Sequence, residues 1–305
     1  MTSLSLTATY VGGPTAILDV AGLRFITDPT FDRGGTDYET PVYVLHKQAS
    51  PAVDENVLGN IDAVLLSHDH HFDNLDRSGR ALLSRARRVF VPLVGAQRLG
   101  GSATGLSAWD EVELDAAGGA RVRITATPAR HGPPDGDRGP VIGFLLSDAR
   151  STSERAPSIY VSGDTVWYEG VEEVARRADV RVAFLFMGAA RVREVGPAHL
   201  TMTADEGVLA ARAMPNAAIV PLHYEGWGHF SEGRAEIERA FTAAGLGDRL
   251  RWPSPGQATK ISVDGWTGGP VDRWTGSLQT SALVHRSSKC AVSWRSTGPP
   301  VHRST

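Results

Sequence analysis

The chain has 305 residues, of which 41% are hydrophobic and 21% are charged, so it can bury a sizeable core and wholesale disorder is excluded. The formal net charge of −3 excludes the strongly basic character typical of proteins that bind nucleic acid or an anionic membrane surface. The single cysteine, Cys290, excludes an intramolecular disulfide framework and a cysteine-rich zinc finger.

The first part of the chain is predicted to be rich in strands. Apolar runs broken by glycine turns predict an antiparallel meander over residues 4–11, 15–20 and 23–27. Residues 33–58 are polar and irregular, and we expect a loop with a short helix near its end. A buried strand is predicted over residues 63–67, a basic amphipathic helix over 75–88 and a strand over 89–94, followed by loop over 95–110.

The second part of the chain is predicted to alternate strands with helices. The strands are expected over residues 112–114, 122–127, 141–146, 159–162, 182–186 and 218–222. The helices are expected over residues 171–177, 203–213 and 234–244. A strand-rich part followed by a mixed part predicts two mixed sheets packed face to face, with helices outside.

The C-terminal segment, residues 265–305, differs in composition from the rest of the chain. It contains one acidic residue, Asp272, many serines and threonines, and tryptophans without helical or strand periodicity. We therefore predict one domain over residues 1–264 and a flexible tail over 265–305. The alternative is a small covering element that the tryptophans anchor.

No targeting or membrane segment is evident in the sequence. Residues 1–13 lack the basic region and the long apolar region of a signal peptide. Nowhere does the sequence approach the roughly 18 uninterrupted apolar residues of a transmembrane helix. We therefore expect a cytoplasmic protein that does not insert into a membrane.

A histidine-rich segment directly after the predicted strand 63–67 is the sharpest motif. It holds three imidazoles and two carboxylates within six residues, among them His68, His70, His71 and Asp73. Neutral imidazole and carboxylate are favoured ligands of a borderline divalent ion such as Zn²⁺. A solvated loop or a helix cap would be the better interpretation of one isolated histidine, but a cluster favours a metal site.

Further histidine and aspartate residues follow other predicted strands. His131, Asp164 and His223 each stand at or near the end of an apolar run, and His199 lies shortly before a predicted helix. Each of them alone could be structural, since an aspartate after a glycine is often a turn residue or an N-cap. Gathered at one rim of a sheet, they would build a polynuclear metal site.

The order of these residues resembles the metallo-β-lactamase superfamily: a His-x-His cluster with Asp, then His131, then Gly163-Asp164, then His223. It is most similar to the branch of ascorbate-phosphate lactonases and N-acyl-phosphatidylethanolamine phospholipase D. The opening segments 10–15 and 27–29 and the late segments 199–202 and 221–224 are also similar to that branch. The resemblance covers about residues 4–255.

The resemblance implies an α/β fold, a four-layer αββα sandwich of two mixed sheets flanked by helices. At one edge it implies a binuclear site where metal-bound hydroxide is the nucleophile. Asp164 would bridge the two ions, and His131 would bind the first of them. His223 would bind the second ion, and Asp73 would bind that ion and orient the hydroxide.

The sequence departs from the His-x-His-x-Asp-His motif of the family. One residue is inserted, so the first-metal pair is either His68 and His70 or His68 and His71. Asn74, a poorer ligand than imidazole, stands where the last histidine is expected, so either one or two ions are predicted. Gly13 replaces a histidine common in the branch, which removes one contact to the substrate.

Other residues are candidates for the chemistry. Asp73 and His199 are the catalytic candidates, with His199 as a hydrogen-bond donor to the substrate or a general acid. The alternative for His199 is a helix cap or a residue that positions a ligand. Tyr224 and Trp227 are candidates for binding the substrate, and their alternative is packing in the core.

We predict a metal-dependent hydrolase of the lactonase, esterase or phosphodiesterase type. It would use Zn²⁺, or Mn²⁺ or Fe²⁺, to cleave an ester, lactone or phosphodiester bond of a small molecule. One alternative is a phosphodiesterase or nuclease on the same fold, although the negative net charge disfavours nucleic acid. The other is a metal-binding protein of this fold without turnover. A homo-oligomer is compatible with the resemblance.

Overall fold

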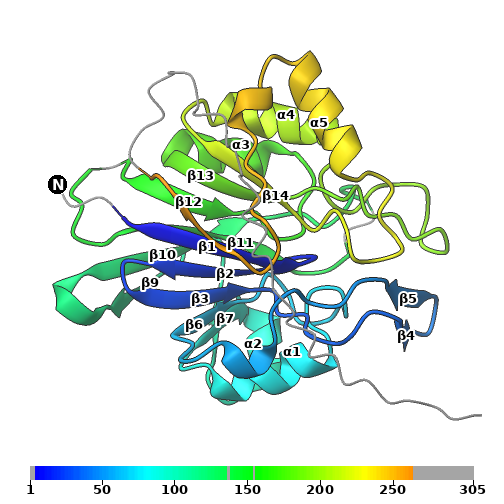
Figure 1. Ribbon diagram of the computed structural model, residues 1–305, viewed down its shortest axis with the longest axis horizontal. Coiled ribbons are helices and arrows are strands. Elements are labelled where there is room, and N and C mark those ends of the chain that lie inside the picture. Colours follow the sequence, from blue (N-terminus) through cyan, green and yellow to red (C-terminus); the bar gives the residue numbers. More distant parts are fainter. Residues whose placement is uncertain (1–3, 136–137, 154, 264–305) are drawn as a thin grey trace, which may run out of the picture. The chain divides into compact units, whose positions relative to one another are not determined.

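Two mixed β-sheets dominate the computed structural model, which describes residues 4–135, 138–153 and 155–263 (Figure 1). The first sheet has the order β15-β1-β2-β3-β6-β7-β8. Its strands are β1 Leu6–Gly12, β2 Thr15–Val20, β3 Leu23–Thr27, β6 Ala63–Leu65, β7 Val89–Pro92, β8 Ala103–Leu106 and β15 Ala258–Ile261. The N-terminal strands pair antiparallel, as predicted from the glycine turns, and β3, β6, β7 and β8 run parallel.

The second sheet has the order β14-β13-β12-β11-β10-β9. Its strands are β9 Glu111–Asp115, β10 Arg121–Pro128, β11 Ile142–Asp148, β12 Pro157–Val161, β13 Asp179–Phe186 and β14 Ala218–Leu222. Strands β9 to β12 are antiparallel, whereas β12, β13 and β14 are parallel. Parallel neighbours place their carboxyl ends at the same edge of a sheet, and this edge carries the site described below.

Helices cover the outer face of each sheet (Figure 1). Helices α1 Arg77–Leu82 and α2 Leu93–Leu99 pack on the first sheet, and α3 Glu169–Arg177, α4 Ala204–Ala213 and α5 Arg234–Ala243 pack on the second. Successive side chains of strand β2 point to opposite faces of the sheet. Leu18 lies in the core between the two sheets, and Ile17 lies in the core under α1 and α2. The predicted four-layer αββα sandwich of two mixed sheets flanked by helices is confirmed.

Some elements lie where the sequence predicted loops. Residues 33–58 contain the hairpin β4 Thr36–Glu39 and β5 Val44–Lys47, and residues 95–110 contain β8 and the end of α2. The hairpin buries Tyr38 and Leu45 against Trp227, which is far away in the sequence. No local sequence pattern therefore predicts this hairpin. The predicted helix over 75–88 is shorter, because α1 gives way to a 3₁₀ turn, η2 Leu83–Arg85.

Short 3₁₀ turns complete the described chain: η1 Glu55–Val57, η3 Ala117–Gly119 and η4 Gly247–Arg249. The first of them is the short helix predicted near the end of residues 33–58. The predicted tail over 265–305 lies outside the described residues. No helix among the described residues combines the length and the apolar character that crossing a membrane requires.

Candidate metal centre

The strand ends bring most of the predicted ligands to one edge of the two sheets. His68 follows β6, His131 follows β10, Asp164 follows β12 and His223 follows β14. A glycine is required before Asp164, because Gly163 has a φ of +61° and a Cβ there would lie 2.7 Å from the carbonyl of Ile142. All four predicted ligands are buried.

The first cluster is built from three imidazole nitrogens and one carboxylate. Nδ1 of His71 lies 2.9 Å from Nε2 of His68 and 3.1 Å from Nε2 of His131. Oδ2 of Asp164 lies 3.5 Å from the same nitrogen of His131. Imidazole and carboxylate donors that converge in this way are the ligand set of a divalent ion such as Zn²⁺.

His70 and His71 are placed differently. His71 directs Nδ1 at the nitrogens of His68 and His131, whereas Nε2 of the exposed His70 donates to the carbonyl of Arg138 over 2.8 Å. His70 still has a nitrogen within 4.8 Å of donors of His68 and His71. Of the two pairs that the sequence left open, this geometry favours His68 with His71, and the inserted residue is accommodated by turning His70 outward.

The second cluster contains a residue that sequence reasoning missed as a ligand. Nε2 of His229 lies 3.0 Å from Oδ2 of Asp73, and Nε2 of His223 lies 3.5 Å from the same oxygen. His229 stands between Trp227 and Phe230, and such an aromatic context is typical of core packing. Asn74 has no imidazole, so the second cluster needs a histidine from elsewhere. A second histidine shortly after His223 is the sequence signal that points to His229.

Asp164 connects the two clusters. Its Oδ2 faces His131 of the first cluster, and its Oδ1 lies 2.9 Å from Nδ1 of His223 in the second. Asn74 does not take the place of the missing histidine, because its Nδ2 donates to Oδ1 of Asp164 over 3.1 Å and to Oδ2 of Asp28 over 3.4 Å. Asn74 therefore supports the shared carboxylate.

The buried charges of the second cluster balance one another. Burial raises the pKa of Asp73, but His229 and His223 outweigh burial and hold that pKa well below its usual range. The pKa of Asp164 is lowered in the same way, against burial, by His223 and His131. Burial lowers the pKa of His223, but Asp164 and Asp73 raise it to about 10. A proton on His223 thus supplies the positive charge that a bound cation would replace.

The first cluster has the opposite electrostatic character. Burial and then the neighbouring imidazoles lower the pKa of His68 well below its usual value, and they lower the pKa of His71 to about 3. Both side chains are therefore neutral at pH 7, which is the form of imidazole that binds a metal ion.

Hydrogen bonds outside the two clusters orient the ligands. Nδ1 of His131 lies 2.8 Å from the carbonyl of Leu200, which can only accept, so this nitrogen carries the proton and Nε2 presents its lone pair to the cluster. The neighbouring His199 is directed elsewhere, with Nε2 3.0 Å from Oε1 of Glu206. Glu206 belongs to the capping box of α4, so His199, the residue before Leu200, is held by the start of this helix.

A metal ion would satisfy buried atoms that lack a partner. Among the described residues, Oδ2 of Asp164 and Nε2 of His223 are buried and make no hydrogen bond. Leaving such atoms unpaired in a protein interior is costly. His223 also has a φ of +53°, a conformation that costs a residue with a side chain about 1–3 kcal/mol and that is typical of functional sites. The donors present therefore fit a divalent metal ion.

The two predicted substrate contacts are buried. Tyr224 is 7% exposed and lies in the core under α3, α4 and α5, with its ring stacked 6.4 Å from that of Tyr10. Trp227 is 3% exposed and packs against the hairpin β4–β5. It also explains Gly13, because a Cβ at this glycine would lie 3.1 Å from Nε1 of Trp227. The histidine of the branch would have to displace the tryptophan.

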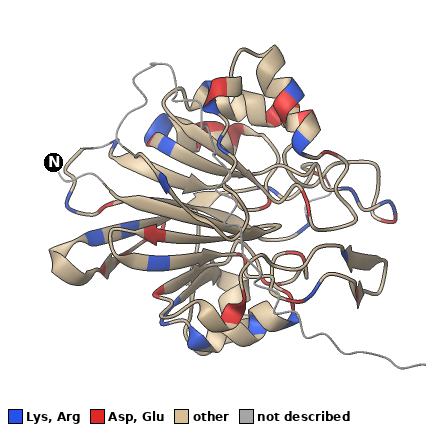
Figure 2. Ribbon diagram, in the orientation of Figure 1, with Lys and Arg blue, Asp and Glu red and all other residues tan. Residues whose placement is uncertain are grey.

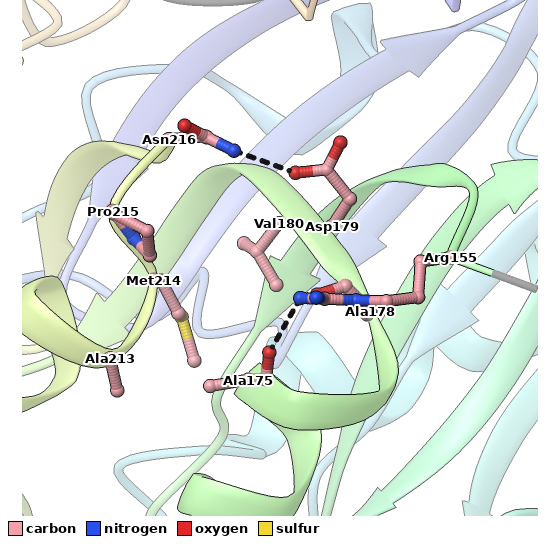
Figure 3. A pocket seen from close by; sticks show the side chains of 9 residues that line it. All are labelled: Arg155, Ala175, Ala178, Asp179, Val180, Ala213, Met214, Pro215 and Asn216. Carbon is pink, nitrogen blue, oxygen red and sulfur yellow. Dashed lines mark hydrogen bonds between the residues drawn. The ribbon is translucent and has the colours of Figure 1, made fainter.

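A pocket of about 300 Å³ lies away from these residues, beside α3 and the end of α4 (Figure 3). Arg155 donates to the carbonyls of Ala175 and Ala178 over 3.1 and 3.0 Å, and Asn216 donates to Asp179 over 3.1 Å. None of the residues that line the pocket belongs to either cluster. This pocket is therefore separate from the candidate metal centre.

The layered fold and the two ligand clusters define a metal-dependent hydrolase with the metallo-β-lactamase fold. The family model of the β-lactamase superfamily domain matches residues 23–224, and the chain belongs to this family. Residues 23–224 include every residue of the two clusters except His229.

Known proteins resemble the chain over most of its length. The UPF0173 protein YddR of Bacillus subtilis is 24% identical over 259 residues, which cover 82% of this chain and 98% of that protein. The isothiocyanate hydrolase from Delia radicum gut bacteria has the same fold, with a TM-score of 0.68 and 21% identity over 84% of this chain and 99% of its own. Igni18, a metallo hydrolase of Ignicoccus hospitalis, has a TM-score of 0.63 and 22% identity over 85% and 99%.

Proposed function

We propose that the protein hydrolyses an ester, lactone or phosphodiester bond of a small molecule with one or two zinc ions, or with manganese or iron in their place. Its resemblance to the lactonase and phospholipase D branch supports this choice of bond. The observation that carries the proposal is the pair of His and Asp clusters joined by Asp164. Such a shared carboxylate is what a two-metal hydrolytic site needs.

The described residues have different roles in such a reaction. A divalent ion in this ligand set would lower the pKa of a bound water to about 7 and so supply a nucleophile at neutral pH. The first ion would be held by His68, His71, His131 and Asp164, and the second by Asp73, His223 and His229 together with Asp164. Asp73, ionised across the physiological range, would accept a hydrogen bond from the attacking water and orient it. His199, the predicted donor to the leaving group, would have to exchange its contact with Glu206 for that role.

A small molecule is a better substrate candidate than a nucleic acid. The net charge is −3, and Figure 2 shows acidic and basic residues interspersed along the described strands and helices. A nuclease on this fold would need a basic surface to neutralise phosphates. An assay of hydrolysis distinguishes this function from the alternative, a protein that binds metal without turnover.

The test combines metal content with hydrolysis. Purified protein is analysed for released metals by mass spectrometry and assayed with a nitrophenyl ester, a lactone, bis(4-nitrophenyl) phosphate and an isothiocyanate, the substrate class named for the gut-bacterial hydrolase. The Asp164→Asn variant is compared with Asp148→Asn, which changes a carboxylate that pairs with Arg150 on the surface. We expect metal and turnover in the wild type and the control only. Full metal content and activity in Asp164→Asn would overturn the proposal, and metal without turnover of any substrate would favour the binding protein.

A further inference from the structure

Four hydrophobic side chains beside the candidate metal centre are only partly buried. We call them the apolar rim, and they are Tyr43, Phe72, Val195 and Phe230. The centroid of the Phe230 ring lies 4.8 Å from that of His223 and 4.5 Å from that of His229. A hydrophobic residue that keeps part of its surface accessible thus packs directly against two ligands of the second cluster.

The surrounding backbone fixes the position of Phe230. Gly188 makes room for its ring, because a Cβ at this glycine would overlap with Cδ1 of Phe230. Phe230 also forms an antiparallel bridge with Ala190, and the N–H of Ser231 donates to the carbonyl of Gly188 over 3.1 Å. A surface that is already ordered binds a ligand without first losing conformational entropy.

On one side, the apolar rim borders the second cluster. Tyr43, Phe72 and Phe230 pack against the buried hydrophobic cluster that contains Trp227. Phe72 directly precedes the ligand Asp73 in the chain. These three side chains therefore extend from the ligand segment after β6 to the hairpin β4–β5.

On the other side, the apolar rim lies near the first cluster. Tyr43, Val195 and Phe230 pack against another buried hydrophobic cluster, which contains Leu200. The carbonyl of Leu200 accepts the hydrogen bond from Nδ1 of His131, a ligand of the first cluster, over 2.8 Å. Since Tyr43 and Phe230 belong to both groups, the apolar rim is one connected surface beside both metal clusters.

We infer that the apolar rim binds an apolar group of the substrate, an alkyl chain or an aromatic ring, next to the bond to be cleaved. The inference rests on the proposed hydrolytic function and narrows its substrate class. Sites for small molecules are lined mainly by hydrophobic and aromatic side chains, and accessible apolar surface beside a reactive centre is what a substrate covers. Each methylene group buried there improves binding about fourfold.

The experiment measures the binding of two hydroxamates that differ only in chain length. Hydroxamates chelate zinc, so both probes are anchored at the metal centre, and the longer chain can contact only neighbouring residues. Acetohydroxamate and hexanohydroxamate are titrated by calorimetry into the full-length protein, after its zinc content has been determined. Hexanohydroxamate should bind at least about tenfold more tightly, because its additional methylene groups leave water.

Variants of the apolar rim test whether these residues cause the difference. Val195→Asn should reduce the affinity ratio of the two hydroxamates about threefold or more, and Phe230→Asn should reduce it further, whereas Phe230→Leu should keep most of it. Val57→Asn is the matched control, because it changes a valine of η1 that is 72% exposed and outside the apolar rim. This control should keep the wild-type ratio.

The outcomes separate this inference from the proposed function. An affinity ratio that falls in Val195→Asn or Phe230→Asn but not in Val57→Asn supports the inference, even when no ester, lactone or phosphodiester is hydrolysed and the choice of bond fails. A wild-type ratio near one, a ratio that neither rim variant lowers, or one that Val57→Asn lowers equally overturns the inference, even when hydrolysis is observed. Zinc-loaded protein that binds neither hydroxamate also overturns it, and a protein that takes up no zinc overturns both.

Discussion

The side-chain amide of Asn74 donates a hydrogen bond to Oδ1 of Asp164 over 3.1 Å. The residue that replaces the last histidine of the family motif thus holds the carboxylate shared by both clusters. The third donor of the second cluster comes instead from His229, whose Nε2 lies 3.0 Å from Asp73. The loop after β14 thus offers a third donor that the segment after β6 lacks.

Replacing Asn74 with alanine should weaken metal binding at both clusters. Asp164 would lose one of the two donors to Oδ1, and such orienting contacts typically contribute tenfold to hundredfold to metal affinity. Because Asn74 is fully buried, the substitution should also lower the free energy of unfolding of the protein by about 1–3 kcal/mol. Competition with a zinc indicator and urea unfolding of the metal-free protein measure the two effects. Unchanged zinc affinity would mean that Asp164 is oriented without Asn74.

Replacing His229 with alanine should remove the second ion and spare the first. The first cluster, which consists of His68, His71, His131 and Asp164, does not contain His229, so about one ion per chain should remain. Metal analysis after gel filtration measures the stoichiometry. His46→Ala, which removes an exposed histidine paired with Asp37, is the matched control and should keep the wild-type metal content. Equal metal content in both variants would contradict the ligand role.

Replacing Lys47 with methionine should destabilise the fold and loosen the second cluster. Lys47 is buried, pairs with the fully buried Asp76 at 2.7 Å, and forms a β-bridge to Trp227, two residues before His229. Breaking a buried ion pair from one side costs about 3–5 kcal/mol, because the other charge is left unpaired. Urea unfolding of the metal-free protein should show this loss. The double variant with Asp76→Asn should be less destabilised than the sum of both single variants, and strict additivity would contradict the coupling.

The metal-free protein should lose stability as the pH falls below about 6.5. Burial lowers the pKa of His68, His70 and His71 in the folded state, that of His71 to about 3. Because these histidines bind protons at a higher pH in the unfolded chain than in the folded protein, this stability is present above pH 6.5 and is lost as the pH falls. Asp28, whose pKa burial raises to about 8, offsets about one of these three protons.

Thermal unfolding in EDTA at several pH values measures this dependence. Tm should fall from pH 7 to pH 5, and His71→Gln should fall less steeply, because it removes one of the three titrating groups. His46→Gln, outside the site and exposed, should keep the wild-type slope. A Tm that is constant or rises toward pH 5 would show that the three imidazoles are already protonated in the folded protein.

Local sequence patterns are sufficient to predict some strands of this fold but not others. Strands β2 and β3 begin and end at the predicted residues, because alternating apolar residues and flanking glycine turns are local signals. The hairpin β4–β5 was predicted as loop, because its buried residues Tyr38 and Leu45 contact Trp227, and a contact between distant segments leaves no local periodicity.

The sequence by itself determined the layered α/β fold, the superfamily and the set of strand ends that carry histidine and aspartate, since residue type and spacing are properties of the chain alone. Only the tertiary structure decided which imidazole nitrogens converge, because ring direction depends on backbone angles and on partners such as the carbonyl of Leu200. The same holds for His229, because its partner Asp73 comes from a remote segment, and a distance between remote segments exists only once the chain is folded.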